Sequence, residues 1–145
     1  MNHKYIFFNE EMIEKIKSGK KTQTRRPIRK LVCCYGKPGD RLLLIKRTPA
    51  SAYMRDHFPR LFSRFFFWWI EGAVEVVSIE AKPLKKYIDL KAEGFDFDPK
   101  TSRLFFNGPA QERERFFEYW DKIYGNTIYK SINNPPVWVI EFKVV

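Results

Sequence analysis

One short stretch near the start of the chain, from Ser18 to Pro27, contains the side chains best suited to chemistry. It combines cations with neutral hydroxyl and amide groups, which a basic turn that only aids solubility does not need. A solvated basic turn is nevertheless the alternative explanation for this stretch. The seven candidate residues are Lys20, Lys21, Thr22, Gln23, Thr24, Arg25 and Arg26.

The side-chain types in this stretch favour nucleic-acid or nucleotide binding. Lysine and arginine neutralise phosphates, while glutamine and threonine can contact base edges or sugar hydroxyls. An aromatic ring nearby would add stacking on a base. Trp68 and Trp69 are adjacent, so in a strand one of the two rings faces outward, and we take Trp68 as the stacking candidate. RNA, another single-stranded nucleic acid or a nucleoside-like small molecule is the expected partner.

Positive charge is concentrated in the first half of the chain. The 145 residues carry a formal net charge of +10. Residues 1–72 contain 16 basic and 6 acidic side chains, whereas residues 73–145 contain 11 of each. A concentrated basic field attracts polyanions, and nucleic acid is the leading class of partner. A basic protein without such a partner is the alternative.

Composition disfavours metal sites and membrane spans. Cys33 and Cys34 are adjacent, which suits neither a disulfide between them nor a zinc site built with His3 and His57. We therefore expect no metal and no cofactor, and free thiols favour a cytoplasmic location. No stretch approaches the roughly 20 apolar residues of a membrane span. The N-terminus lacks the apolar core of a signal peptide.

A short helix is predicted to lead directly into the candidate stretch. Asn9 is expected to cap a short helix with Met12, Ile13 and Ile16 on its apolar face, which ends at Gly19 directly before the stretch. The most clearly periodic helix covers residues 111–123. The strands expected around them cover residues 5–8, 41–47, 65–70, 73–80 and 137–145.

The remaining segments are predicted to be irregular. An excursion with one or two helical turns is expected at residues 48–64, a short helix or turn at 92–95, and loops at 27–39 and 96–109. Strands at both ends and in the middle of the chain, with two main helices, indicate an α+β fold. We expect a small, mostly antiparallel, barrel-like sheet in a single domain, residues 1–145.

Five stretches, in order along the chain, carry a resemblance to a known family. They are residues Ser18–Arg26, Tyr35–Leu42, Ala92–Phe95, Phe117–Gly125 and Asn134–Phe142. Together they resemble the ASCH domain family, which is related to PUA RNA-binding domains, and most of all the versions carried by phages and prophages. The resemblance covers nearly the whole chain. It implies a PUA-like β-barrel with a cleft formed at the Gly-Lys-Lys-Thr sequence, and binding of RNA or a nucleotide.

The resemblance also implies an enzymatic activity. Some small bacterial members are similar to amidohydrolases that remove the acyl group from acetylated cytidine, and their lysine, threonine and glutamate correspond to Lys21, Thr24 and Glu93. Flanking cations would lower the pKa of Lys21, allowing it to take the proton of the Thr24 hydroxyl. Glu93 would orient the lysine or protonate the leaving amine. Because a regular strand would place Lys21 and Thr24 on opposite faces, this chemistry requires an irregular backbone.

One departure from the family concerns the substrate. Members often carry an acid shortly after the strand that begins at Gly39 and Asp40, where this chain has Lys46 and Arg47. If that acid shapes the pocket, the substrate differs here. Three functions therefore stand at this stage: RNA or nucleotide binding through a basic cleft centred on residues 20–26, the amidohydrolase, and a phage-derived adaptor that binds a host protein.

Overall fold

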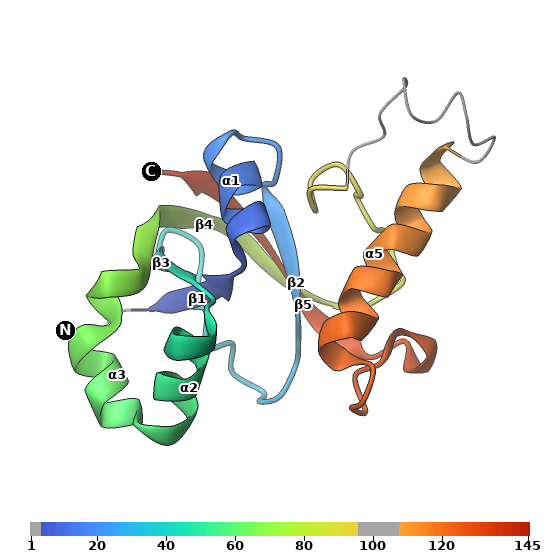
Figure 1. The fold of residues 1–145 in the computed structure, drawn as a ribbon. Coiled ribbons are helices and arrows are strands. Elements are labelled where there is room, and N and C mark those ends of the chain that lie inside the picture. Colours follow the sequence, from blue (N-terminus) through green and yellow to red (C-terminus); the bar gives the residue numbers. More distant parts are fainter. Residues whose placement is uncertain (1–3, 96–107) are drawn as a thin grey trace.

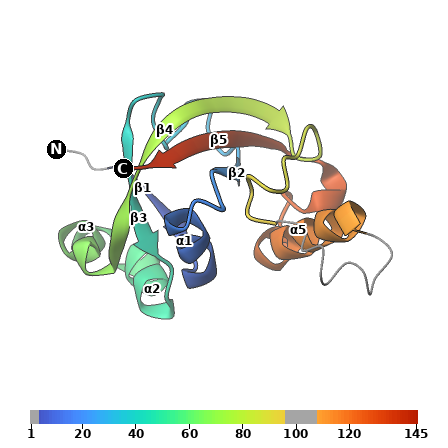
Figure 2. The same ribbon diagram turned by 90° about the horizontal axis from the view of Figure 1, so that it is seen from above.

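A curled sheet of five strands forms the centre of the protein, seen in a computed structural model that describes residues 4–95 and 108–145 (Figures 1 and 2). The strand order is β1-β3-β4-β5-β2, with β1 and β3 parallel and every other pair antiparallel. The sheet therefore forms a mostly antiparallel half-barrel, which confirms the predicted α+β class. The strands are β1 (Tyr5–Phe8), β2 (Gln23–Pro27), β3 (Arg41–Lys46), β4 (Ile70–Pro83) and β5 (Pro136–Val144).

Alternating apolar residues place the main core on one face of this sheet. Strand side chains alternate between faces, so one face of β3, β4 and β5 collects a buried set. The helix α1 (Glu10–Lys17) closes this core with the three residues predicted for its apolar face. The buried members include Leu42, Leu44, Val74, Val76, Ile140, Met12, Ile13 and Ile16.

The ends of α1 are formed as the sequence predicts. Asn9 caps the helix, because its side-chain oxygen accepts a hydrogen bond from the Met12 amide at 2.9 Å. Gly19 follows the helix with φ +79°, a conformation that favours glycine. The amides of Lys20 and Lys21 then donate to the Lys15 carbonyl at 2.9 and 3.0 Å. Helix α1 therefore delivers the candidate stretch in a defined position before β2 begins.

The long helix α5 (Gly108–Tyr124) lies on the same side of the sheet as α1 (Figure 2). The helix predicted at residues 111–123 is thereby confirmed. Its residues Phe116, Trp120 and Tyr124 pack on Val137 and Val139 of β5, forming a second buried cluster. Figure 2 shows both helices on the inner side of the arched sheet, with the segment that follows β4 between them.

Two sequence predictions between residues 48 and 70 need correction. The segment at residues 48–64 forms two helices, α2 (Pro49–His57) and α3 (Pro59–Phe65), each with proline in its first turn. The strand predicted at residues 65–70 is wrong, because Phe66–Trp69 form a 3₁₀ helix and only Ile70 begins β4. Helical winding lets Phe62, Phe66 and Trp69 lie on one side, with Tyr5 5.6 Å from Phe62 and 6.1 Å from Phe66 between ring centroids.

The other segments are mostly as expected. Residues 92–95 form a turn, and residues 28–40 form neither helix nor strand. Most of the loop predicted at residues 96–109 lies outside the described residues. Within residues 4–95 and 108–145, no helix has the length and apolar character needed to cross a membrane.

Candidate functional site

A pocket of about 270 Å³ lies between α1, the start of β2 and α5. It contains all three residues that the family resemblance implies for catalysis, although Glu93 is 72 positions from Lys21 in the sequence. Its other walls are largely apolar and aromatic, which is typical of small-molecule sites. The main lining residues are Phe8, Asn9, Met12, Lys21, Thr24, Arg25, Arg26, Arg47, Glu93, Phe95, Phe116, Tyr119, Trp120 and Lys122.

The terminal ammonium group of Lys21 is held by main-chain and side-chain partners. Its ammonium donates to the main-chain carbonyls of Gln23 at 2.8 Å and Glu93 at 2.7 Å. The Glu93 carboxylate oxygen Oε2 lies 3.6 Å from Lys21 Nζ, which makes this a longer ion pair. The Lys21 side chain is only 4% exposed, so these partners replace water around its charge.

Burial lowers the pKa of Lys21 from 10.5 to about 8. The nearby charge of Glu93 opposes this shift, whereas Arg26 and Lys15 add to it. The sequence predicts the same direction of shift from flanking cations. The larger physical cause is desolvation, and of the flanking cations Lys20, Arg25 and Arg26 only Arg26 contributes.

Glu93 is bound to the sheet by Arg25. Arg25 Nε donates to Glu93 Oε1 at 3.1 Å, and the rest of the guanidinium donates to the carbonyls of Leu84 at 3.1 Å and Tyr87 at 2.8 Å. Burial raises the pKa of Glu93, while Lys21 and Arg25 act in the opposite direction. Arg25 therefore joins β2 to the segment that supplies the glutamate.

Thr24 reaches the same pocket as Lys21 because the backbone changes direction between them. β2 begins only at Gln23, after the amides of Thr22 and Gln23 have both donated to the Ala92 carbonyl at 2.8 and 2.9 Å. The irregular backbone that the enzymatic hypothesis requires is therefore present. Thr24 is buried, and its hydroxyl has no hydrogen-bond partner within the described residues.

Further pocket residues connect β1, β2, the start of α1 and α5. The guanidinium of Arg26 lies 4.8 Å from the Phe8 ring centroid and donates to the Phe7 carbonyl at 2.7 Å. Asn9 Nδ2 donates to the Tyr119 hydroxyl at 3.0 Å, which connects the start of α1 to α5. Burial raises the pKa of Tyr119, so the phenol stays protonated near neutral pH.

The other candidate residues of the sequence do not gather at this pocket. Lys20 and Thr22 are exposed, and Gln23 is buried without lining the pocket. Trp68 is 69% exposed on the 3₁₀ helix after α3 and does not line the pocket. The structure thus divides the basic stretch into buried residues with internal partners and exposed residues facing solvent.

The lining residues that the sequence does not predict as site residues include four with polar or charged groups: Asn9, Arg47, Tyr119 and Lys122. For Arg47, the signal in the sequence is its position, where members of the resembling family often carry an acid. The other three belong to predicted helices or caps, where packing and capping explain them equally well. Their convergence depends on how α1 and α5 are placed on the sheet.

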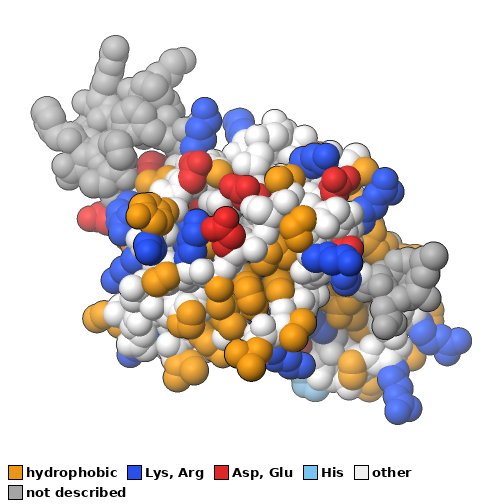
Figure 3. All heavy atoms as spheres, turned by 180° about the vertical axis from the view of Figure 1, so that it is seen from behind, with side chains coloured by type: hydrophobic (Ala, Val, Ile, Leu, Met, Phe, Trp, Pro, Cys, Tyr) orange, Lys and Arg blue, Asp and Glu red, His pale blue; other side chains and the backbone are white. Residues whose placement is uncertain are grey.

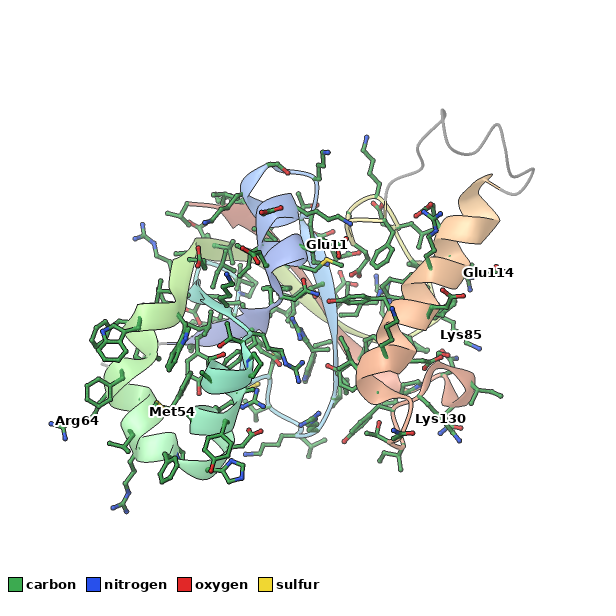
Figure 4. The ribbon with its side chains drawn as sticks, viewed as in Figure 1. Glu11, Met54, Arg64, Lys85, Glu114 and Lys130 are labelled. Atoms are coloured by element: carbon green, nitrogen blue, oxygen red, sulfur yellow. The ribbon has the colours of Figure 1, made fainter. Side chains whose placement is uncertain are left out.

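The side of the molecule away from α1 and α5 has a different character. Figure 3 shows apolar side chains gathered in the middle of that face, with Lys and Arg scattered around them and Asp and Glu in between. Figure 4 shows that Arg64 of α3 points away from the body of the protein. Within residues 4–95 and 108–145, no group of three His, Cys, Asp or Glu side chains could hold a metal ion.

Comparison with known proteins identifies the fold. No family model and no curated protein matches the sequence. The structure of an ASCH domain from Lactobacillus crispatus JV V101 matches 98% of this chain and 77% of its own, with a TM-score of 0.54 and 12% identity. A protein from Enterococcus faecalis V583, with the family model DUF984, matches 100% of this chain and 82% of its own, with a TM-score of 0.53 and 15% identity. The chain therefore shares the fold of these two structures, one of which is an ASCH domain.

Proposed function

We propose that this chain is an ASCH family member that hydrolyses an acyl amide on a nucleoside-like substrate. The observation that carries the proposal is Lys21, a buried lysine with a pKa of about 8 that lines one pocket with Thr24 and Glu93. A lysine with this pKa is partly neutral at physiological pH and can accept a proton. Lysine, threonine and glutamate are also the residue types implied by the family resemblance.

The contacts of Lys21 suit a proton acceptor. Two of its N–H groups are taken by the carbonyls of Gln23 and Glu93. In the neutral amine, both N–H groups would be used in these two hydrogen bonds, and the lone pair would be free to accept a proton. Lys21 would take the proton of the Thr24 hydroxyl, directly or through a water molecule, while the threonine oxygen forms a bond to the acyl carbon.

The remaining steps return the protein to its starting state. The bond between the acyl carbon and the amine nitrogen breaks, and the nitrogen takes a proton from the Lys21 ammonium. Water then adds to the acyl group on Thr24, with Lys21 again receiving a proton. The bond between the acyl carbon and the threonine oxygen breaks, that oxygen takes the proton back from Lys21, and the carboxylic acid leaves. Glu93 orients Lys21 and, together with Arg26, sets the charge around the developing oxyanion.

The volume and the aromatic lining of the pocket suit a small ligand. A volume of about 270 Å³ is near the lower end of known small-molecule sites. The rings of Phe8, Phe116, Tyr119 and Trp120 supply an aromatic lining on which a base could stack. Substrate identity, phage or prophage origin and cytoplasmic location stay predictions from the resemblance and the composition.

RNA binding is the second candidate, favoured by the concentration of charge in residues 1–72. Because Lys21 and Arg25 are buried with internal partners, exposed cations such as Lys20 would contact the phosphates instead. Affinity for single-stranded RNA should then fall by about 0.7 log units per log unit of salt for each phosphate neutralised. An affinity unaffected by salt would remove this candidate. An adaptor function would show neither hydrolysis nor this salt dependence.

Hydrolysis of acetylated cytidine by the wild-type protein, beside Lys21→Met and Glu93→Gln, tests the enzyme. We expect wild-type turnover and a loss of about 100-fold or more in Lys21→Met, because general base catalysis contributes about this much. Circular dichroism would establish that each variant is folded. Absence of turnover by the wild-type protein at high concentration, or full activity in folded Lys21→Met, would refute the proposal.

A further inference from the structure

Basic side chains are in large excess around the pocket. Five of them line it, against the single carboxylate of Glu93. Two of the five, Lys21 and Arg25, are the ion-pair partners of that carboxylate. The other three are Arg26, Arg47 and Lys122.

These three cations have no acidic partner among the described residues. Arg26 donates only to the Phe7 carbonyl, and its Nε is buried without a hydrogen-bond partner. Arg47 and Lys122 are exposed, and neither takes part in an ion pair within the described residues. The outer part of the pocket therefore holds cations that form no ion pair among the described residues.

The acids near these cations form no ion pair with them. Asp56, whose pKa Arg47 helps to lower, pairs with Arg55, and Asp121 beside Lys122 accepts hydrogen bonds from Ser131. The two acids at the start of α1 have other partners as well. Glu11 lies on α1 on the side toward α5 (Figure 4), but its carboxylate pairs with Lys15 at 3.2 Å. Glu10 pairs with Lys46 at 3.2 Å. Each acid at this end of α1 thus already has a lysine partner outside the group of three.

The three cations come from separate elements that meet at the pocket. Arg26 is in β2, Arg47 directly follows β3, and Lys122 is near the end of α5. Arg26 and Arg47 both line the pocket, and both lie close enough to Tyr119 for their charges to lower its pKa. Like charges held around one concave site repel one another and focus a field that attracts an anion.

We infer that the ligand of this pocket carries a phosphate group, bound at the outer end by Arg47 and Lys122 with Arg26 behind them. The preferred ligand is then a nucleotide and not a neutral nucleoside. This inference rests on the proposed function only for the nucleoside part of the ligand. The phosphate can belong to a mononucleotide or be a diester within a strand, since both present the same oxygens to the cations.

Calorimetric titration with cytidine, cytidine 5′-monophosphate and a short oligocytidylate tests the inference without hydrolysis. We expect the monophosphate to bind at least about tenfold more tightly than cytidine, because charge-assisted hydrogen bonds are worth about this much. Arg47→Ala and Lys122→Ala should each remove about a factor of ten from monophosphate affinity and change cytidine affinity much less. Lys30→Ala is the matched control, because it removes one exposed charge that does not line the pocket.

Each outcome decides between the possibilities. Tight binding of the oligonucleotide alone, lost in Arg47→Ala, would support the inference and assign the phosphate to a strand. Equal affinity for cytidine and its monophosphate, or binding of neither monophosphate nor oligonucleotide, would overturn it. Hydrolysis of acetylated cytidine could still succeed in that case. Conversely, phosphate-dependent binding without any hydrolysis would uphold the inference and overturn the enzymatic proposal.

Discussion

Lys21 and Glu93 lie against each other in the interior of the protein, each with almost no exposure to solvent. Lys21 Nζ is 3.6 Å from Glu93 Oε2 and donates to the Glu93 main-chain carbonyl at 2.7 Å. Burial disfavours the charged form of both groups, lowering the pKa of Lys21 to about 8 and raising the pKa of Glu93. Removing two charged groups from water costs free energy that their mutual attraction often does not recover. Ionisable groups with perturbed pKa values cluster at functional sites, which makes this pair a candidate for a functional role.

The pH dependence of hydrolysis should follow Lys21. As a base, Lys21 must be neutral, so activity should rise with pH up to its pKa of about 8 and then level off. Measurement of kcat/KM across this range checks the expectation. Lys21→Arg, whose side chain stays charged, should lack both the activity and the rise. A wild-type profile that is flat between about pH 6 and about pH 9 would contradict the role of Lys21 as base.

The Thr24 hydroxyl should matter for activity and little for stability. It has no hydrogen-bond partner within the described residues, so Thr24→Val removes the nucleophile while keeping the side-chain shape. We expect hydrolysis to be lost. The free energy of unfolding should change by less than about 1.5 kcal/mol, because removing a hydroxyl without a partner leaves no other polar group unsatisfied. Thr24→Ser keeps a hydroxyl and should retain part of the activity. Substantial activity in Thr24→Val would exclude the threonine as nucleophile.

Removal of Arg25 should destabilise the fold. Arg25→Leu leaves the Glu93 carboxylate buried with one cation and takes donors away from the carbonyls of Leu84 and Tyr87. Breaking a buried ion pair from one side typically costs about 3–5 kcal/mol, measured here by urea unfolding. Arg64→Ala, an exposed arginine on α3, should change stability by less than about 0.5 kcal/mol. Equal effects of the two substitutions would show that the Arg25 contacts contribute little.

Gly94 should be required for the position of Lys21. It has φ +90°, and an added Cβ would lie 3.3 Å from Lys15 Cδ and 3.4 Å from Lys21 Cβ. Gly94→Ala should cost about 1–2 kcal/mol for the left-handed backbone and also lower activity by displacing Lys21. Gly39→Ala is the control, because Gly39 has the same φ with nothing within 4 Å of the added Cβ. The prediction fails if both variants have wild-type activity or lose it equally.

Asn9 combines two roles that substitution can separate. Its Oδ1 caps α1 through the Met12 amide, and its Nδ2 donates to Tyr119. Asn9→Ala should lose about 1 kcal/mol or more of stability, because both contacts are removed. Asn9→Ser keeps a capping oxygen but has no group in the place of Nδ2, so its thermal stability should lie nearer the wild type while the contact with α5 is lost. Equal losses in the two variants would show that the cap has no separate contribution.

Local patterns along the chain predict the secondary structure around the site. Asn9 and Gly19 mark the two ends of α1 through capping chemistry that acts within a few residues. The periodicity of Phe116, Trp120 and neighbouring residues predicts α5, and the β-branched residues near the C-terminus predict β5. Local pattern misleads at residues 65–70, where a run of aromatic residues favours a strand. There, ring packing against Tyr5 and Phe62 selects a helical path instead.

The sequence by itself determined the α+β class, the helix that presents residues 20–26 and the choice of this stretch as a candidate site. Only the tertiary structure decided which of these residues share a pocket. Lys21 and Thr24 converge because the chain binds the Ala92 carbonyl before β2 starts, and Glu93 and Arg47 reach them from distant segments. Burial, which sets the pKa of Lys21, is likewise a property of the packed fold. Such long-range contacts depend on how helices and strands pack, and no local spacing specifies them.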